Sequence, residues 1–136
     1  RSNITKGNVT KGDIYKLMPF DNELVILDLN KEDFQNLLEY ISLRGGEPFS
    51  GMKIVMGSKN KLIDYEMSSI INFDKGDKLK VLTSDYLANG GDNMWFFEGK
   101  KTTNTGIKVR DLIIDHCRNE KIISSKLDNR LIQIFE

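Results

Sequence analysis

Hydrophobic and polar positions near the start of the chain first follow a helical period. Thr10 followed by Asp13 has the spacing of a helix start, with a capping hydroxyl and an acid at the third helical position. The apolar side of this helix consists of Ile14, Leu17 and Met18. Pro19 ends it, because the residue before a proline disfavours the helical conformation.

The next pattern predicts a strand followed by a longer helix. Residues 24–29 form an apolar run of strand length, which we expect to be buried on both faces. Asn30 is placed to cap the following helix, and Gly45 and Gly46 to end it. Apolar residues at positions i, i+3, i+4 and i+7 give this helix one face toward the core: Phe34, Leu37, Leu38 and Ile41.

The second half of the chain mixes further strands with one more helix. Strands are predicted at residues 52–56, 66–73, 79–83 and 131–135, with a glycine-containing turn at 74–77. Thr105 and Gly106 are predicted to open a third helix. Its apolar side is Ile107, Val109, Leu112, Ile113 and Ile114, and its solvent side is Lys108, Arg110, Asp111 and Asp115. Without strict alternation of strands and helices, the order favours an α+β fold with a mixed sheet.

Composition narrows the class of protein. At 136 residues the chain is long enough for one domain with a core, and its formal net charge is zero. A surface built for nucleic acid or acidic membranes needs a basic excess, which this chain lacks. No apolar run approaches the roughly 20 residues of a membrane span. The chain begins at Arg1 without a methionine or signal peptide, so we expect an excised or processed segment.

The residues for an autonomous reaction centre are few. His116 is the only histidine and Cys117 the only cysteine, and they are expected to be a surface or packing residue and a small buried apolar residue. A zinc site uses more histidines or cysteines than this, and a nucleophilic serine or cysteine would have only His116 as an orienting histidine base. A phosphate-binding loop ending in Gly-Lys-Ser/Thr does not occur in the sequence.

Binding chemistry is concentrated in residues 85–92, with the sequence Asp-Tyr-Leu-Ala-Asn-Gly-Gly-Asp. The glycines allow the backbone to approach a ligand closely, and Tyr86 offers a flat face for stacking. Asp92 offers two acceptor oxygens for hydroxyl groups. Together they suit a planar ring that carries a sugar. For Phe20, ordinary core packing is the simpler reading, and residues 95–97 are expected to pack in the interior or an interface.

Several segments, taken in order, resemble the C-terminal domain of the 5'-nucleotidase family. This family includes bacterial UDP-sugar hydrolases, 2',3'-cyclic-nucleotide phosphodiesterases and animal ecto-5'-nucleotidases. The matching pieces are residues 12–22, 85–92, 105–111 and the tail 129–132. The Pro-Phe and Asn-Gly-Gly-Asp segments in this order are the most specific part, whereas residues 59–77 follow the family only loosely.

The resemblance implies particular roles for particular residues. The family clamps the nucleobase between two aromatic rings, which correspond to Phe20 and Tyr86. The aspartate after the two glycines binds the ribose hydroxyls and corresponds to Asp92. Arg1 has the spacing of a family arginine that contacts the substrate phosphate, although its preceding glycines are missing. The implied substrate-binding set is Arg1, Phe20, Tyr86, Asn89, Gly90, Gly91 and Asp92.

The resemblance also implies a fold and a function. The expected fold is α+β, with mixed sheets and helices packed outside in four layers, α/β/β/α, as one domain over residues 1–136. The expected function is nucleotide or nucleoside binding within a 5'-nucleotidase-type phosphohydrolase of the periplasm or cell surface. An N-terminal metallophosphatase domain, in cis or in trans, would supply the two divalent metals. The chain itself is expected to hold no cofactor and to show no turnover with added Mn²⁺.

Two alternatives remain at this point. In the first alternative, the chain is a separately encoded, non-catalytic binding partner of a metallophosphatase. In the second, it is a domain that kept the fold and lost the ability to bind its ligand. A signal sequence and start codon shortly before Arg1 would favour the first of these, and absence of nucleoside binding the second.

Overall fold

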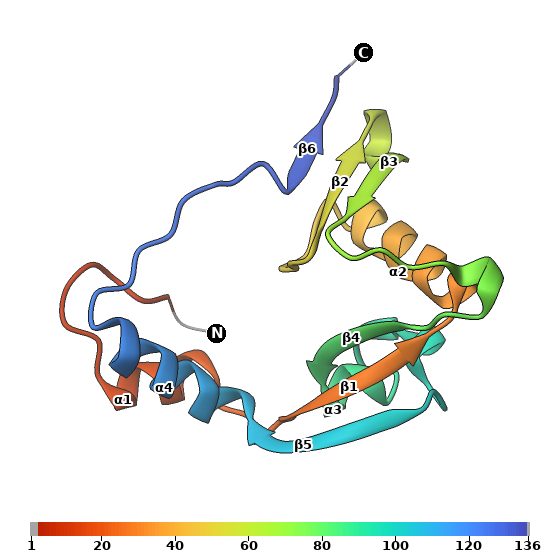
Figure 1. Cartoon of the computed structure of the whole chain (residues 1–136). Helices are drawn as coiled ribbons and strands as arrows, with labels where there is room; N and C mark the ends of the chain where they lie inside the picture. Colours follow the sequence, from red (N-terminus) through yellow and green to blue (C-terminus); the bar gives the residue numbers. More distant parts are fainter. Residues whose placement is uncertain (1–2, 136) are drawn as a thin grey trace.

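Two three-stranded sheets and four α-helices make up the computed structural model, which describes residues 3–135 (Figure 1). The elements are α1 (Lys11–Leu17), β1 (Glu23–Leu29), α2 (Lys31–Leu43), β2 (Met52–Met56), β3 (Leu62–Met67), β4 (Leu79–Ser84), α3 (Asp85–Ala88), β5 (Thr102–Lys108), α4 (Val109–Glu120) and β6 (Leu131–Gln133). Short 3-10 turns include η3 (Gly91–Asn93) and η4 (Trp95–Phe97).

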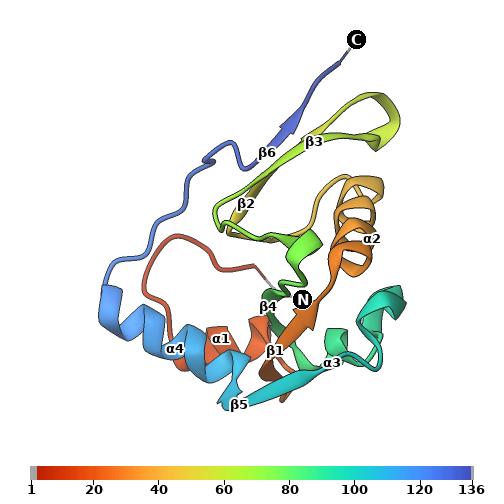
Figure 2. The same cartoon turned by 45° about the vertical axis from the view of Figure 1, so that its right-hand side comes forward.

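The two sheets differ in strand direction. Sheet A has the order β4-β1-β5 and is antiparallel throughout. Sheet B has the order β3-β2-β6 and is mixed, because β2 runs antiparallel to β3 and parallel to β6. Helix α2 contacts strands of both sheets, whereas α1 and α4 lie against each other (Figures 1 and 2). This arrangement confirms the expected α+β class with two sheets.

The core is built around the apolar face of α2, as its spacing predicts. Phe34, Leu37, Leu38 and Ile41 are all buried and join the inward side chains of β1 and β2. Asn30 caps this helix, and its side chain accepts from the Asp33 N–H at 2.9 Å. The predicted capping box at the start of α1 also forms: Thr10 Oγ1 accepts from the Asp13 N–H at 3.2 Å. Hydrogen bonds from Thr10 lower the pKa of the Asp13 carboxyl.

Strand β1 corrects the expectation of burial on both faces. Val25, Leu27 and Leu29 are buried, while the alternate residues on the opposite face are only partly buried. The reason is that sheet A is antiparallel, and such sheets commonly pack one face on the core while the other meets solvent. A run of apolar residues alone does not distinguish the two cases.

Three predicted boundaries differ from the structure, and the mildest case is the strand expected at 131–135, which ends at Gln133. The strand expected at 66–73 is β3, which ends at Met67, because its partner β2 begins at Met52 and these two residues pair. The helix expected to open at Thr105 begins at Val109 instead. Residues 102–108 are strand β5, and the Thr105 hydroxyl donates to the Leu24 carbonyl at 2.7 Å. Pairing with β1 therefore overrides the helical spacing of this segment.

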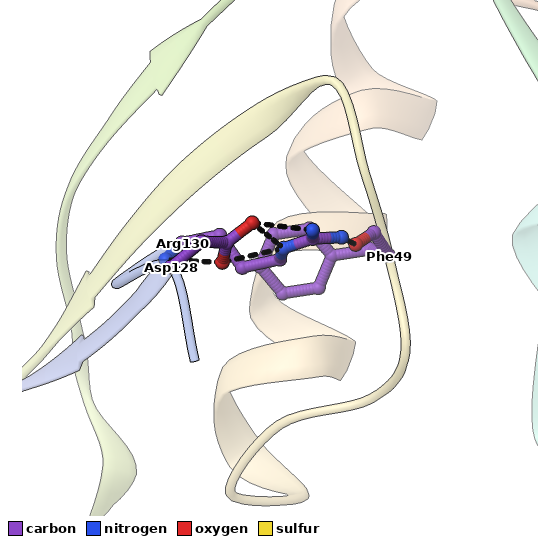
Figure 3. A network of polar contacts seen from close by, with 3 residues as sticks. All are labelled: Phe49, Asp128 and Arg130. Carbon is purple, nitrogen blue, oxygen red and sulfur yellow. Dashed lines mark hydrogen bonds and ion pairs between the residues drawn. The ribbon is translucent and has the colours of Figure 1, made fainter. Parts of the chain in front are cut away.

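The C-terminal strand is secured by an arginine just before it. The Ile54 N–H donates to the Arg130 carbonyl at 2.8 Å, which continues the parallel pairing of β2 with β6. The Arg130 guanidinium hydrogen-bonds both Asp128 and the Phe49 carbonyl (Figure 3). Its hydrogen bonds lower the pKa of Asp128 to about 2. These contacts tie the end of the chain to the loop between α2 and β2.

Candidate functional site

Two predicted segments lie at the same end of sheet A. We call residues 19–22 the Pro-Phe segment and residues 85–92 the site loop. The first precedes β1 and the second follows β4, and these antiparallel strands pair Leu24 with Ser84. Their register therefore brings a segment from near the start of the chain toward one about 65 residues later.

Both predicted clamp rings are accessible to a ligand. The relative exposure of Phe20 is 55% and that of Tyr86 is 51%, so Phe20 is not a core residue. Within residues 3–135, neither ring belongs to an aromatic pair. Large exposed aromatic surface near a sheet end is available for stacking.

The site loop folds into a compact turn because of its short helix and its glycines. The Ser84 hydroxyl caps α3 and accepts from the Leu87 N–H at 3.3 Å. Ala88 is buried and anchors the helix to the core. Gly90 then takes φ +87°, a left-handed conformation that favours glycine, and reverses the chain.

Tyr86 and Asp92 are held together across this turn. The Tyr86 hydroxyl donates to Asp92 Oδ1 at 3.2 Å and lies 3.3 Å from the Asp92 N–H, from which it accepts. Gly91 lies directly against Tyr86. A Cβ atom at position 91 would sit 2.5 Å from the Tyr86 carbonyl oxygen and 2.6 Å from two ring carbons. Glycine at this position is therefore required by packing rather than by the backbone angle.

Asp92 adopts an unusual backbone conformation and is fixed from a distant helix. Its φ is +53°, in the left-handed region, where aspartate is tolerated better than most residues. The Tyr40 hydroxyl of α2 donates to the Asp92 carbonyl at 2.8 Å. Burial raises the pKa of Tyr40, and the guanidinium of Arg44 lies 5.2 Å from its ring centre. Tyr40 thus couples α2 to the site loop.

The Pro-Phe segment is held by Arg110, near the start of α4. The guanidinium donates to the Met18 carbonyl at 3.2 Å, to the Phe20 carbonyl at 3.5 Å, and to the Asp21 carboxylate. Its carbon atom lies 4.1 Å from the centre of the Tyr15 ring. This placement corrects the prediction that Arg110 lies on the solvent side of its helix.

The Asp21 carboxylate lies beside two positively charged side chains, Arg110 and Lys108. The hydrogen bond from Arg110 and the positive charge of Lys108 lower the pKa of the Asp21 carboxyl. The Lys108 ammonium lies 3.7 Å from the same carboxylate oxygen. Asp21 therefore remains ionised well into the acid range and compensates the buried guanidinium.

Tyr40 and Arg110 are the residues of this region that the sequence did not indicate. Each meets its partner across 50 to 90 positions of the chain, and side-chain spacing carries no signal for such contacts. Arg110 has one local hint, because its helix begins immediately after β5, the strand that pairs with the start of β1. The pairing itself is decided only in three dimensions.

The other residues named in the sequence analysis differ in their exposure. Asn89 is exposed at the end of α3, and its N–H donates to the Asp85 carbonyl at 3.0 Å. Phe96 and Phe97 are buried as expected of interior residues, but Trp95 is 65% exposed. His116 is exposed on α4, and the neighbouring Cys117 is partly buried. Arg1 lies outside the described residues.

A cavity of about 370 Å³ lies behind the site loop rather than at the two rings. Leu87 in the site loop and Met94 just after it are among its lining residues, together with apolar side chains of α2 and β4. Phe20, Tyr86 and Asp92 do not line it. The three residues are exposed at the surface outside this cavity, which lies among apolar side chains of the core.

The described residues offer neither a metal-binding cluster nor a membrane-spanning helix. Among residues 3–135, no three His, Cys, Asp or Glu side chains are grouped so that they would hold a metal ion. The family resemblance implies the two-metal site for an N-terminal metallophosphatase domain and not for these residues. Across this range, none of the helices has the length and apolar character needed to cross a membrane.

Comparison with known proteins identifies the class of domain. The profile of the family described as "5'-nucleotidase, C-terminal domain" matches residues 1–99. Because the match spans most of the chain, this protein belongs to the family of 5'-nucleotidase C-terminal domains. The chain contains both clusters that carried the resemblance within the matched range, the Pro-Phe segment and the site loop.

Among curated proteins, the chain is similar to parts of two longer proteins. It is 24% identical to the trifunctional nucleotide phosphoesterase YfkN of Bacillus subtilis, with 99% of this chain and 10% of that protein covered. It is 21% identical to an apyrase of Tabanus yao, with 96% of this chain and 27% of that protein covered. The chain therefore spans about a tenth and about a quarter of these two relatives.

Solved structures share the fold. A 5'-nucleotidase precursor from Thermus thermophilus superposes with a TM-score of 0.80 at 21% identity, covering 98% of this chain and 29% of that one. The NAD nucleotidase of Haemophilus influenzae gives a TM-score of 0.74 at 18% identity, covering 100% and 28%. At such identities the likeness concerns the fold, and it agrees with the α+β architecture described above.

Proposed function

We propose that this domain binds the nucleoside part of a nucleotide for a 5'-nucleotidase-type phosphohydrolase. The observation that carries the proposal is the pair of half-exposed rings, Phe20 and Tyr86, at one end of sheet A, with Asp92 in the same loop as Tyr86. Membership of the 5'-nucleotidase C-terminal domain family supports the same reading.

The two rings would supply most of the attraction for the base. Base–aromatic stacking contributes roughly 1–3 kcal/mol per base and depends little on which base is bound. Tyr86 replaces the phenylalanine that is commoner in the family and keeps the flat face. A domain of this kind would accept several nucleotides rather than select one.

Asp92 would bind the sugar. An ionised carboxylate accepts hydrogen bonds from two neighbouring hydroxyls, and such charge-assisted bonds are stronger than neutral ones. The left-handed backbone at Asp92 and the bond from Tyr40 to the Asp92 carbonyl would fix this residue in place before the ligand arrives. Asn89, Gly90 and Gly91 would shape the loop that lets the ribose approach.

Hydrolysis itself is assigned to a different domain. Water activation on two divalent metals would come from a metallophosphatase domain, in cis or in trans. The role of residues 1–136, taken as one domain, would be to orient the nucleotide so that its phosphate meets those metals. We infer a periplasmic or cell-surface location from the family alone, with a nucleotide and the metallophosphatase as the partners.

Calorimetry with adenosine tests the proposal directly. We expect Phe20→Ala and Tyr86→Ala each to weaken binding by about tenfold, the equivalent of ~1.4 kcal/mol, with little change in folding. Phe135→Ala is the matched control, because it removes an exposed ring on the C-terminal side of β6. Unaltered affinity in both clamp variants, or no adenosine binding by the unmodified chain, would overturn the proposal.

A further inference from the structure

Arg110 is unusually enclosed for a residue near the start of a surface helix. Its side chain is only 11% exposed, while that of its carboxylate partner Asp21 is 67% exposed. The guanidinium stacks on Tyr15 of α1 and donates to two carbonyls of the chain that connects α1 to β1. One side chain therefore contacts both the helix before Phe20 and the backbone of Phe20 itself.

The chemistry of the guanidinium makes these contacts specific. Arginine carries five N–H donors in a planar fork, whereas lysine offers a single ammonium point. A buried charge must be compensated, so the acceptors around it become fixed in position. The acceptors here are the Met18 carbonyl, the Phe20 carbonyl and the Asp21 carboxylate, on three residues within a stretch of four.

A second contact fixes the arginine relative to the same stretch. The Val109 N–H, at the first residue of α4, donates to the Asn22 carbonyl at 3.0 Å. The helix start and the Pro-Phe segment are thus bonded on the main chain as well as through the guanidinium. The Phe20 ring is half exposed. We therefore infer that backbone contacts largely set its direction.

We propose that Arg110 is a positioning residue for Phe20: it holds the backbone of the Pro-Phe segment so that the ring stands ready for a nucleobase. The proposal rests on the proposed function, in which Phe20 is one face of the clamp. It adds a residue from α4 that touches no nucleotide and acts only through Phe20.

A double-mutant cycle in the full chain tests this route, with adenosine affinity measured by calorimetry. Arg110→Gln removes the charge and the fork, and Arg110→Lys keeps the charge but not the fork. Asp21→Asn weakens the network at its exposed end, where folding is least at risk. Arg118→Gln is the matched control, since Arg118 lies on the same helix in an exposed pair with Asp115 at 3.4 Å.

We expect Arg110→Gln to weaken adenosine binding by about tenfold and Arg110→Lys by somewhat less, with Arg118→Gln unchanged. In a Phe20→Ala background, Arg110→Gln should cause no further loss, because its effect passes through the missing ring. An equal loss in that background would show that Arg110 acts elsewhere and would overturn the proposal. Undiminished binding in both Arg110 variants would overturn it as well.

A fluorine label separates this inference from the proposed function. With 4-fluorophenylalanine at position 20, the ¹⁹F chemical shift of the unmodified chain should differ clearly from that of the free amino acid. In Arg110→Gln the signal should narrow and move toward that of the free amino acid. This readout needs no ligand. If adenosine fails to bind, the proposed function falls, and the signal alone then decides about Arg110: an unchanged signal in the variant would overturn the positioning role.

Discussion

The site loop and the Pro-Phe segment each present one half-exposed aromatic ring, but they are held in place differently. In the site loop, Tyr86, Gly91 and Asp92 contact one another within seven positions of the chain. In the Pro-Phe segment, the holding group is Arg110, which comes from a helix 90 positions away. The comparison teaches that a binding surface can combine a locally encoded half with a half that exists only after the chain has folded.

The difference has a consequence for substitutions. Changes within the site loop should act on Tyr86 and Asp92 together, because these residues share hydrogen bonds. Changes around Phe20 should act through the distant arginine and leave Asp92 alone. The following predictions test the two halves separately.

The largest effect is expected from Gly91→Ala. The new methyl group would lie 2.5 Å from the Tyr86 carbonyl, a backbone atom that cannot rotate away. We expect a loss of about 1–3 kcal/mol in loop stability and a fall of roughly tenfold or more in adenosine affinity. Calorimetry and urea unfolding measure both quantities. Gly12→Ala on α1, where the nearest atom is 3.6 Å away, serves as the control.

Tyr40→Phe should have the next largest effect, and the effect should be confined to the site loop. It removes the hydroxyl that donates to the Asp92 carbonyl at 2.8 Å, a bond worth about 1 kcal/mol. We expect adenosine affinity to fall by a few fold, or about 0.5–1 kcal/mol. Tyr65→Phe, on the ring that packs against Phe34, is the matched control. The coupling of α2 to the site loop is contradicted if both variants bind adenosine equally well.

Tyr86→Phe sharpens the comparison by separating base stacking from sugar binding. The ring face is kept, but the hydroxyl that occupies Asp92 Oδ1 is removed. Because this oxygen then becomes available to the ligand, the preference for adenosine over 2'-deoxyadenosine should rise by about two- to threefold. Competition calorimetry with the two nucleosides gives this ratio. A fall in the ratio would mean that the hydroxyl helps Asp92 to bind ribose.

The smallest effect is expected from acidification, which probes the distant half. Arg110 and Lys108 lower the pKa of Asp21 below its ordinary value of 3.8. A lowered folded-state pKa means that the stabilising contribution is complete above the ordinary value and is lost as pH falls through the folded value. The urea midpoint of the unmodified chain should therefore exceed that of Asp21→Asn by a constant amount between about pH 5 and 8.

Below that range the two midpoints should converge, since protonated Asp21 no longer pairs with Arg110. Urea titrations at several pH values measure the convergence. A difference that grows on acidification would contradict the assignment of Asp21 as the partner of the buried guanidinium.

Several features of the fold were predictable because their causes are local. The caps at Thr10 and Asn30 need only residues three positions away, and both form as expected. The apolar stripe of α2 follows from helical spacing, and every residue of the stripe is buried. The site loop also has local causes, since a cap, two glycines and a tyrosine lie within nine positions, although α3 and its Ser84 cap were not among the predicted elements.

The failures all concern contacts between distant segments. Residues 105–108 have helical spacing, yet they extend because the edge of β1 offers hydrogen bonds to them. The outer face of β1 is only partly covered because sheet A is antiparallel, a fact that its own apolar run does not contain. Arg110 looked like a solvent-facing residue, because its acceptors come from a different part of the chain.

The sequence by itself determined helices α1 and α2, most of the strands and the motifs that carry the family resemblance, because capping, spacing and turn chemistry act over a few residues. The tertiary structure alone decided which sheet end receives Phe20 and which groups fix it. It also decided that Tyr40 bonds the Asp92 carbonyl and that Arg110 bonds the backbone around Phe20. Strand pairing and the burial of a charged side chain depend on which distant segments of the chain come into contact. Those contacts exist only in the folded protein.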